Sequence, residues 1–175
     1  MLETIITSKT RIKLLLKFFL NKDTKSYLRN LEAEFGESTN AIRIELNRLE
    51  SAGLLTTELS GNKKLFQANT RHPLYADIHN ILIKTFGIDQ IIEKVTSNIG
   101  DLKETYLLGD LAIGKDSKVI DLLLVGEKID RAYVSKLTEK VEGRIDRKIR
   151  YLILSEEEKD SFLKTNRSFL IWKAV

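Results

Sequence analysis

The stretch from Ser38 to Asn69 constrains the fold most, because a helical pattern passes directly into a hairpin pattern. Apolar residues at Ile42, Leu46 and Leu49 have the spacing of one helical face. Ser38 is placed to cap the start of this helix, and Gly53 to end it. The following letters, "LLTTELSGNKKLFQAN", predict two short strands around an "SGNKK" turn.

Two further helices are predicted upstream, from "SKTRIKLLLKFFLN" and from "KSYLRNLEAEFG", which ends on a glycine suited to stop a helix. Both segments carry apolar residues at helical spacing. These residues are Ile12, Leu15, Leu16 and Phe19 in the first helix, and Leu28, Leu31 and Phe35 in the second. Three helices, a short turn before the third, and a basic-tipped hairpin describe a winged helix-turn-helix.

The positive charge is concentrated in this first part of the chain. Residues 1–72 hold 12 Lys+Arg and 8 Asp+Glu, whereas residues 73–175 hold 17 of each, so the whole net charge of +4 comes from residues 1–72. A polyanionic partner is therefore expected to meet the N-terminal part. Its third helix would face a DNA groove with side chains suited to base edges and phosphates, and the hairpin tip would reach the backbone. The candidate DNA-binding residues are Thr39, Asn40, Arg43, Asn47, Arg48, Asn62, Lys63 and Lys64.

Residues 8–70 resemble the ArsR/MarR-type bacterial transcription regulators, most specifically through "LNRLESAGLL" and the hairpin entered directly after its glycine. The resemblance implies sequence-specific binding of double-stranded DNA, usually by a dimer. The chain has no cysteine, which excludes the thiolate metal sensors of that group. Winged helices also serve as protein-interaction modules, so an adaptor without DNA binding is a competing hypothesis.

Residues 73–100 are expected to form a helical connector. Pro73 is suited to open a helix, and a second helix is expected from about Asp89. An apolar stripe must be buried either against a second copy of the chain or against the C-terminal domain, and dimerisation is the preferred interpretation. The apolar residues are Leu74, Ile78, Ile81 and Leu82 in the first helix, and Ile91, Ile92 and Val95 in the second.

Residues 101–175 alternate between short apolar strands and helices, which indicates a small α/β or α+β layer. The strands are predicted in "ETYLLG", "KVIDLLLVG" and "RKIRYLIL". Asp130 and Ser155 are placed as caps of the two helices, and three glutamates follow Ser155 where the helix dipole favours them.

Residues 104–175 also resemble the minimal nucleotidyltransferase domain of bacteria. That family has a glycine after its first strand, a second glycine further on, and an Asp-x-Asp pair on the next strand. Gly109, Gly114 and Asp121 match this frame, and Asp110 replaces the serine that follows the first glycine. Val119 stands at the first acidic position of the pair and cannot bind a metal ion.

The strand expected to supply a third acid, "RKIRYLIL", contains no carboxylate. The sequence therefore predicts a domain without catalytic residues, metal or cofactor, with Gly109, Asp110, Gly114 and Asp121 as a vestigial nucleotide pocket. Two alternatives stay open. The pocket retains a nucleotide or phosphorylated small molecule as an effector, or an active metal-dependent transferase uses Asp110 or Asp116 with Asp121 and docks a partner through the winged helix.

The fold class expected is α+β, with three parts: a winged helix-turn-helix (1–72), a helical connector (73–100) and a degenerate nucleotidyltransferase-like sheet domain (101–175). The function expected is a dimeric DNA-binding transcription regulator that is not an enzyme. Basic residues interrupt the N-terminal apolar pattern, and no apolar run reaches the ~18–20 residues of a membrane span. A cytoplasmic protein without membrane contact is therefore expected.

Overall fold

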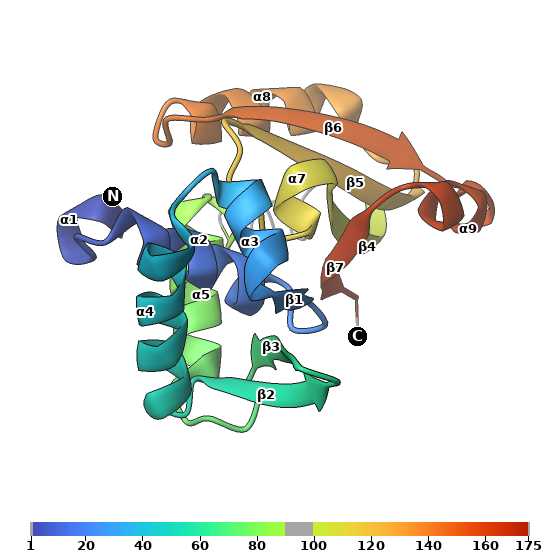
Figure 1. The fold of residues 1–175 in the computed structure, drawn as a ribbon. Coiled ribbons are helices and arrows are strands. Elements are labelled where there is room, and N and C mark those ends of the chain that lie inside the picture. The colour runs from blue at the N-terminus through green and yellow to red at the C-terminus, as the bar shows by residue number, and fades with distance from the viewer. Residues whose placement is uncertain (1, 90–99, 175) are drawn as a thin grey trace. The chain divides into compact units, whose positions relative to one another are not determined.

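A computed structural model describes residues 2–89 and 100–174 of the chain. It divides the chain into two compact units, an N-terminal unit of residues 1–82 and a C-terminal unit of residues 83–175. Each unit has its own sheet, three-stranded in the first and four-stranded in the second (Figure 1). The three-part division at 72 and 100 stays a prediction.

The N-terminal unit consists of helices followed by a hairpin and a further helix, in the order expected from the sequence (Figure 1). Its elements are α1 (Leu2–Ile5), α2 (Lys9–Leu15), a π-helical turn η1 (Leu16–Leu20), β1 (Lys25–Tyr27), α3 (Leu28–Phe35), α4 (Thr39–Ser51), β2 (Leu55–Ser60), β3 (Lys63–Ala68) and α5 (Tyr75–Thr85). Helix α5 runs past the boundary between the units.

The ends of these helices follow from local chemistry. The hydroxyl of Ser8 accepts a hydrogen bond from the Arg11 backbone N–H, and Ser38 does the same for Ala41 at the start of α4. Gly36 ends α3 in the left-handed conformation, with a φ of 63°, which a residue with a Cβ adopts only under strain. The cap predicted at Ser38 and the helix stop predicted at Gly36 are confirmed.

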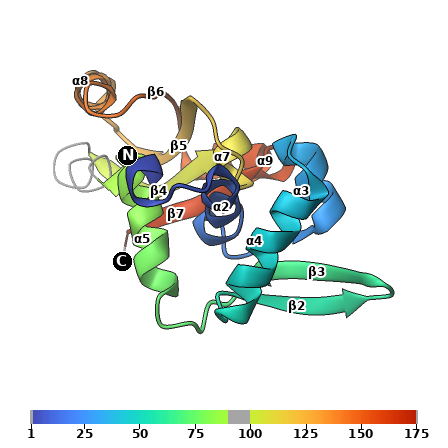
Figure 2. The ribbon, with the colours of Figure 1, turned by 60° about the vertical axis from the view of Figure 1, so that its left-hand side comes forward.

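The hairpin β2–β3 has the register Ser60↔Lys63, so Gly61 and Asn62 form its turn. Gly61 has a φ of 60°, in the region that favours glycine in tight hairpin turns. Strand β1 pairs with β3 and gives the sheet the order β1-β3-β2. Figure 2 shows the hairpin projecting beside α4.

Helix α5 packs on the end of η1. The ring of Tyr75 stacks on Phe19 at 5.6 Å between centroids, and the Phe19 carbonyl lies 2.8 Å from His79 Nδ1. His79 is thus a packing residue. Leu74 and Ile81 remain half exposed, at 52% and 50%. The second connector helix predicted from Asp89 lies almost wholly outside the described residues.

The C-terminal unit has a four-stranded sheet in the order β6-β5-β4-β7, in which only β5 and β6 run parallel. Parallel pairing needs a crossover, which α8 supplies between β5 and β6. The elements are β4 (Asp101–Leu108), α7 (Gly109–Ala112), β5 (Val119–Glu127), α8 (Arg131–Glu142), β6 (Lys148–Leu154), α9 (Glu156–Thr165) and β7 (Ser168–Lys173).

The helices of this unit begin at the predicted caps. The Asp130 carboxylate accepts from the backbone N–H groups of Ala132 and Tyr133. Ser155 and Glu158 form a reciprocal capping box at the start of α9. Strand β7 is an addition to the three strands that the sequence predicted in this unit.

The mixed α+β class is confirmed at the level of two sheets with surrounding helices. Among residues 2–89 and 100–174, the helices are all too short or too polar to cross a membrane.

Candidate nucleic-acid interface and nucleotide pocket

A hollow of about 630 Å³ lies between the start of α3, the exposed side of α4 and the hairpin. Five of the eight candidate DNA-binding residues line it, because α4 and the hairpin turn approach the same space. Its lining residues are Tyr27, Leu28, Arg29, Asn30, Arg43, Asn47, Asn62, Lys63, Lys64 and Phe66. The structure thus brings together the helix and hairpin residues that the sequence had singled out separately.

Most of these polar side chains are left without a partner inside the protein. Arg43, Asn47, Asn62 and Lys63 are exposed, and their side chains make no hydrogen bond or ion pair with another described residue. Asn40 is exposed on the same helix, whereas Thr39 in its first turn is half-buried. A polar group without an internal partner is available to an external one.

Lys64 is anchored within the unit by Glu50 of α4. Its ammonium lies 3.0 Å from Glu50 Oε1, and the same oxygen accepts from the Thr57 hydroxyl, also at 3.0 Å. The hydrogen bond from Lys64 holds the pKa of Glu50 below its usual range. This bridge ties the hairpin to the helix beside the hollow.

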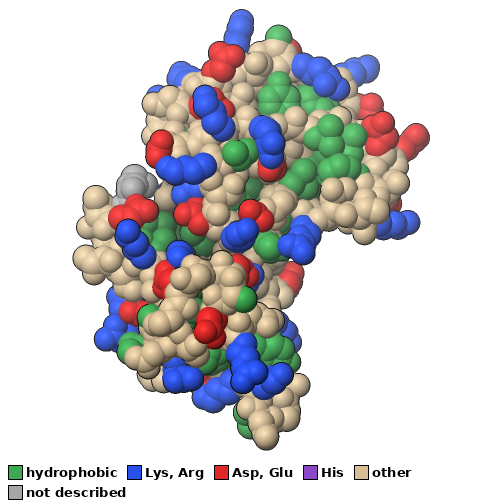
Figure 3. Space-filling model, turned by 45° about the horizontal axis from the view of Figure 1, so that its top comes forward, with side chains coloured by type: hydrophobic (Ala, Val, Ile, Leu, Met, Phe, Trp, Pro, Cys, Tyr) green, Lys and Arg blue, Asp and Glu red, His purple; other side chains and the backbone are tan. Residues whose placement is uncertain are grey.

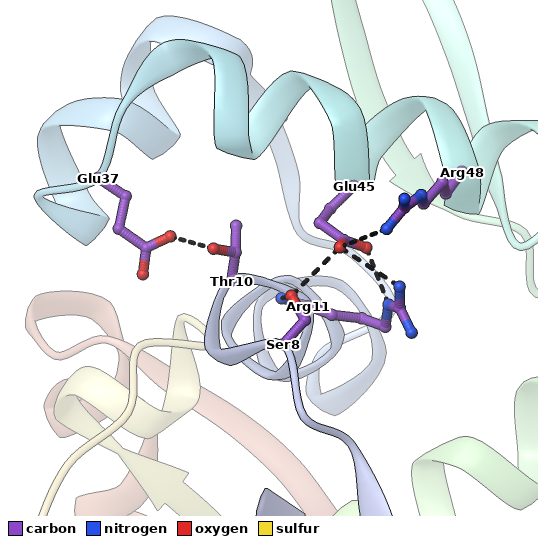
Figure 4. A network of polar contacts seen from close by, with 6 residues as sticks. All are labelled: Ser8, Thr10, Arg11, Glu37, Glu45 and Arg48. Carbon is purple, nitrogen blue, oxygen red and sulfur yellow. Dashed lines mark hydrogen bonds and ion pairs between the residues drawn. The ribbon is translucent and has the colours of Figure 1, made fainter.

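Glu45 joins α4 to α2 behind the exposed face (Figure 4). Its buried carboxylate accepts from Arg11 Nε at 2.8 Å, from Arg48 Nη1 at 3.0 Å and from the Ser8 hydroxyl at 3.2 Å. Burial alone would raise the pKa of Glu45, but the Arg11 guanidinium and the other donors lower it below its ordinary value. The candidate Arg48 therefore shares its charge with Glu45 while its side chain stays 62% exposed.

Sequence reasoning missed three polar residues of the hollow, Tyr27, Arg29 and Asn30. They belong to β1 and the first turn of α3, which pairing with β3 places beside α4. The letters "SYLRN" contain a usable signal, because they place polar and basic residues at the start of a helix in the basic part of the chain.

Charges of both signs are mixed on one face of the protein. Figure 3 shows Lys and Arg side chains interspersed with Asp and Glu over the face that it draws. Arg43 and Lys63 of the hollow are therefore notable for having no side-chain partner among the described residues, rather than for the net charge of the protein.

The C-terminal unit has a hollow of about 330 Å³ at the end of β4. Gly109 follows β4 with a φ of 63°, and a Cβ at that position would lie 3.5 Å from Asp121 Oδ2. The lining residues are Leu108, Gly109, Asp121, Leu122, Arg150, Tyr151, Leu152 and Asn166. Of the four predicted pocket residues, the structure brings Gly109 and Asp121 together, whereas Asp110 and Gly114 do not line the hollow.

Asp121 faces Arg150 across the parallel strands β5 and β6, where the two residues are in register. The guanidinium binds the carboxylate at both oxygens, with Nε–Oδ1 at 2.7 Å and Nη2–Oδ2 at 2.9 Å. The hydrogen bond with Asp121 raises the pKa of Arg150. Asp110 instead lies 3.4 Å from the ammonium of Lys115. Each acid near the glycine turn thus has a basic partner of its own.

These side chains do not fit the paired-carboxylate metal centre that the family resemblance implies. Val119 offers no ligand two residues before Asp121, and Arg150 occupies both oxygens of Asp121. In the part of the chain that the structure describes, no three His, Cys, Asp or Glu side chains gather as a metal ion would need.

The buried acid of this unit lies elsewhere on β4. Glu104 is 6% exposed and lies 2.9 Å from the ammonium groups of both Lys159 and Lys173. The Tyr106 hydroxyl donates to it at 2.7 Å. Burial alone would raise the pKa of Glu104, but these three donors lower it to about 2. The cluster holds α9 and β7 to β4 and does not line the hollow.

Comparison with known proteins gives matches among solved structures only. No protein-family model and no curated protein sequence matches the chain. A protein from Sulfolobus solfataricus described as a "putative nucleotidyltransferase" is 26% identical over 52% of this chain and 82% of its own, with a TM-score of 0.35. A protein from Archaeoglobus fulgidus is 13% identical over 53% of this chain and 98% of its own, with a TM-score of 0.38.

The first of these matches corrects one expectation. The sequence predicted that the chain is not an enzyme, because Val119 replaces an acid and the later strand has none. The similarity to a protein described as a nucleotidyltransferase contradicts that prediction, which we do not retain.

Proposed function

We propose that the N-terminal unit is a winged helix-turn-helix that binds double-stranded DNA and regulates transcription. One observation carries this proposal: α4, the hairpin and the start of α3 surround a hollow lined by Arg29, Arg43, Lys63 and Lys64. Convergent basic and amide side chains, most of them without a partner among the described residues, are suited to phosphates and base edges. The width of a major groove admits one helix, for which α4 is the candidate.

The roles of the residues follow from their places in the unit. Asn40, Arg43 and Asn47 lie on the exposed side of α4 and would contact bases or nearby phosphates. Lys63 and Lys64 follow the hairpin turn at the start of β3 and would bind the adjacent backbone. Of the remaining predicted contacts, Asn62 lines the hollow from the hairpin turn, whereas Thr39 and Arg48 lie on α4 outside its lining.

We further propose that the regulator is a homodimer joined through α5. Leu74, directly before this helix, and Ile81 within it are exposed apolar residues seven positions apart, which is the spacing of one helical side. Two-fold pairing of recognition helices is the usual way for such proteins to read two half-sites.

The test of DNA binding is a salt titration with fluorescently labelled genomic fragments and the full chain. Affinity should fall steeply as salt rises, and replacing both Lys63 and Lys64 by Ala should lower the slope by about 1 to 2, because Lys64 leaves the carboxylate of Glu50 when it binds a phosphate. Lys103→Ala serves as a control, because this lysine is exposed and belongs to the C-terminal unit. Binding that does not depend on salt, or does not occur, overturns the proposal in favour of a protein-interaction adaptor.

A second candidate function belongs to the C-terminal unit. We propose that its hollow receives a nucleotide or a phosphorylated small molecule, either as a nucleotidyltransferase substrate or as an effector. The observation that favours it is Arg150 beside the glycine turn, with 71% of its side chain exposed and able to meet a phosphate.

Titration calorimetry with nucleoside triphosphates, with and without Mg²⁺, tests the second candidate. Arg150→Ala should abolish binding, and Lys148→Ala on the same strand should leave it unchanged because that lysine does not line the hollow. Product analysis after incubation then separates turnover from binding alone. Absence of heat with every nucleotide removes this candidate and leaves the first untouched.

A further inference from the structure

Ile44 is an aliphatic residue on the exposed side of the helix that we assign to the DNA groove. Its relative exposure is 44%, whereas Ile42, Leu46 and Leu49 of the same helix are buried. The apolar stripe that holds α4 to the unit is therefore complete without Ile44. A β-branched side chain at an exposed helical position also has a lower helix propensity than Ala, Lys or Glu. Isoleucine at this position is therefore explained neither by the packing of the unit nor by helix propensity.

The place of Ile44 on the helix is close to the middle of its exposed surface. At ~100° per residue, the exposed residues from Arg43 to Arg48 span about 140° of the helix circumference, and Ile44 lies about 30° from the centre. Arg43 and Asn47, which line the hollow, mark one edge of this arc. Asn40 lies between that edge and Ile44.

The surroundings of Ile44 indicate a small apolar target rather than a protein surface. Its exposed neighbours on α4 are Asn40, Arg43, Asn47 and Arg48, so the aliphatic group stands alone among polar ones. The other large hydrophobics that are exposed in the described part of the chain lie on other elements. Protein docking generally uses a contiguous apolar patch, which α4 does not offer.

Thymine has a chemical group that matches such a residue. Its C5 methyl projects into the major groove and is the one apolar feature among the base edges displayed there. Amide and guanidinium groups on either side of an aliphatic side chain would hydrogen-bond neighbouring base edges or phosphates while the methyl is removed from water.

We infer that Ile44 is a specificity-determining residue that selects a thymine, or another C5-methylated pyrimidine, in the DNA site. The inference rests on the proposed DNA binding and adds to it the identity of a base that α4 reads. The hairpin lysines supply attraction and position, Arg43 would contact a base edge or phosphate beside the methyl, and Ile44 adds discrimination through one methyl group.

The experiment begins with a duplex selected from a random pool by the full chain. Each thymine is then replaced singly by deoxyuridine, which removes the C5 methyl and leaves the hydrogen-bonding edge unchanged. At one thymine of each half-site, the affinity of the wild-type protein should fall about fourfold, the value of one buried methyl group. The parent duplex, which keeps every thymine, is the reference.

Three variants assign the effect to Ile44. Ile44→Ala should bind thymine and uracil duplexes equally, and Ile44→Val should retain most of the discrimination. Ile5→Ala removes an equally apolar side chain, 76% exposed, from α1, and should discriminate as the wild type does. A melting curve for each variant shows that the unit is folded, although the ratio of the two affinities does not depend on the folded fraction.

The outcomes separate this inference from the function on which it rests. Equal affinity for every uracil-substituted duplex, a discrimination that survives in Ile44→Ala, or failure of the pool to converge overturns the role of Ile44, while salt-dependent DNA binding persists. Loss of all DNA binding by the wild-type protein overturns both.

Discussion

The two candidate sites differ in what their charged side chains already hold. On α4 and the hairpin of the N-terminal unit, Arg43 and Lys63 have no partner among the described residues. In the hollow of the C-terminal unit, Asp121 is bound at both oxygens by Arg150. A side chain without a partner meets a ligand directly, whereas a paired one must first release its neighbour. The residue types of a motif therefore indicate where a site lies, and the ion pairs that these residues already form decide how readily the site binds a ligand.

The largest effect on stability is expected at Glu104, which is ion-paired with both Lys159 and Lys173 and lines neither hollow. The folded-state pKa of Glu104 is about 2, against an ordinary value of 4.5. A lowered pKa stabilises the C-terminal unit above pH 4.5, and this contribution, about 3 kcal/mol, disappears as pH falls from 4.5 towards 2. Glu104→Gln should lose it at pH 7.

Urea unfolding followed by the fluorescence of Trp172 checks this, because the chain's one tryptophan lies on β7 of that unit. Asp101→Asn is the control, since Asp101 forms an exposed pair with Lys103. A stability of Glu104→Gln equal to that of wild type at pH 7 would show that this buried cluster is energetically neutral.

The next effect concerns an unpaired residue of the N-terminal unit. Arg43→Ala should reduce the preference for the selected duplex over random DNA by about 1–3 kcal/mol, because a base-reading arginine contributes that much discrimination. Competition binding at fixed salt measures it. An equal loss for selected and random DNA would assign Arg43 to a phosphate instead.

A smaller effect is expected at Glu45, the paired residue behind the same helix. Glu45→Gln should destabilise the N-terminal unit by about 1–2 kcal/mol, because charge-assisted hydrogen bonds from Arg11 and Arg48 are weakened while the buried volume is kept. Thermal unfolding by circular dichroism measures the loss. Glu58→Gln, from an exposed pair with Lys25, is the matched control.

The smallest effect is expected at Asp121. Its pair with Arg150 is open to solvent on the arginine side, so Asp121→Asn should change the stability of the C-terminal unit by less than about 1 kcal/mol. The same substitution leaves Arg150 without a carboxylate and should strengthen phosphate binding in calorimetry. A weaker affinity would mean that Asp121 itself contacts the ligand, and the contrast between the two units would then narrow.

The sequence predicted the elements whose signals are local. Ser38 and Gly36 mark helix ends through hydrogen bonding and a positive φ, and Asp130 and Ser155 do so in the C-terminal unit. The hairpin was predictable because its turn and its strands adjoin in the sequence.

What the sequence did not predict depends on distant pairing. Strand β1 has three residues and exists because β3 pairs with it, which also places Arg29 at the hollow. Strand β7 is likewise defined by its antiparallel register with β4. The pairing of Asp121 with Arg150 follows from the register of β5 and β6, which lie on either side of a crossover helix. Residue types were therefore predictable, and their partners were not.

The bridge between Lys64 and Glu50 has a consequence for the thermodynamics of the proposed association with DNA. Glu50 acts as a resident counterion for Lys64, so a DNA phosphate that takes the ammonium leaves a carboxylate that recruits a cation from solution. Part of the entropy gained when DNA sheds its condensed cations is thereby returned. The hairpin also arrives at DNA already fixed to its helix, which reduces the ordering that binding would otherwise require. Glu50 thus weakens the electrostatic contribution to binding and at the same time holds the hairpin in a preorganised position against α4.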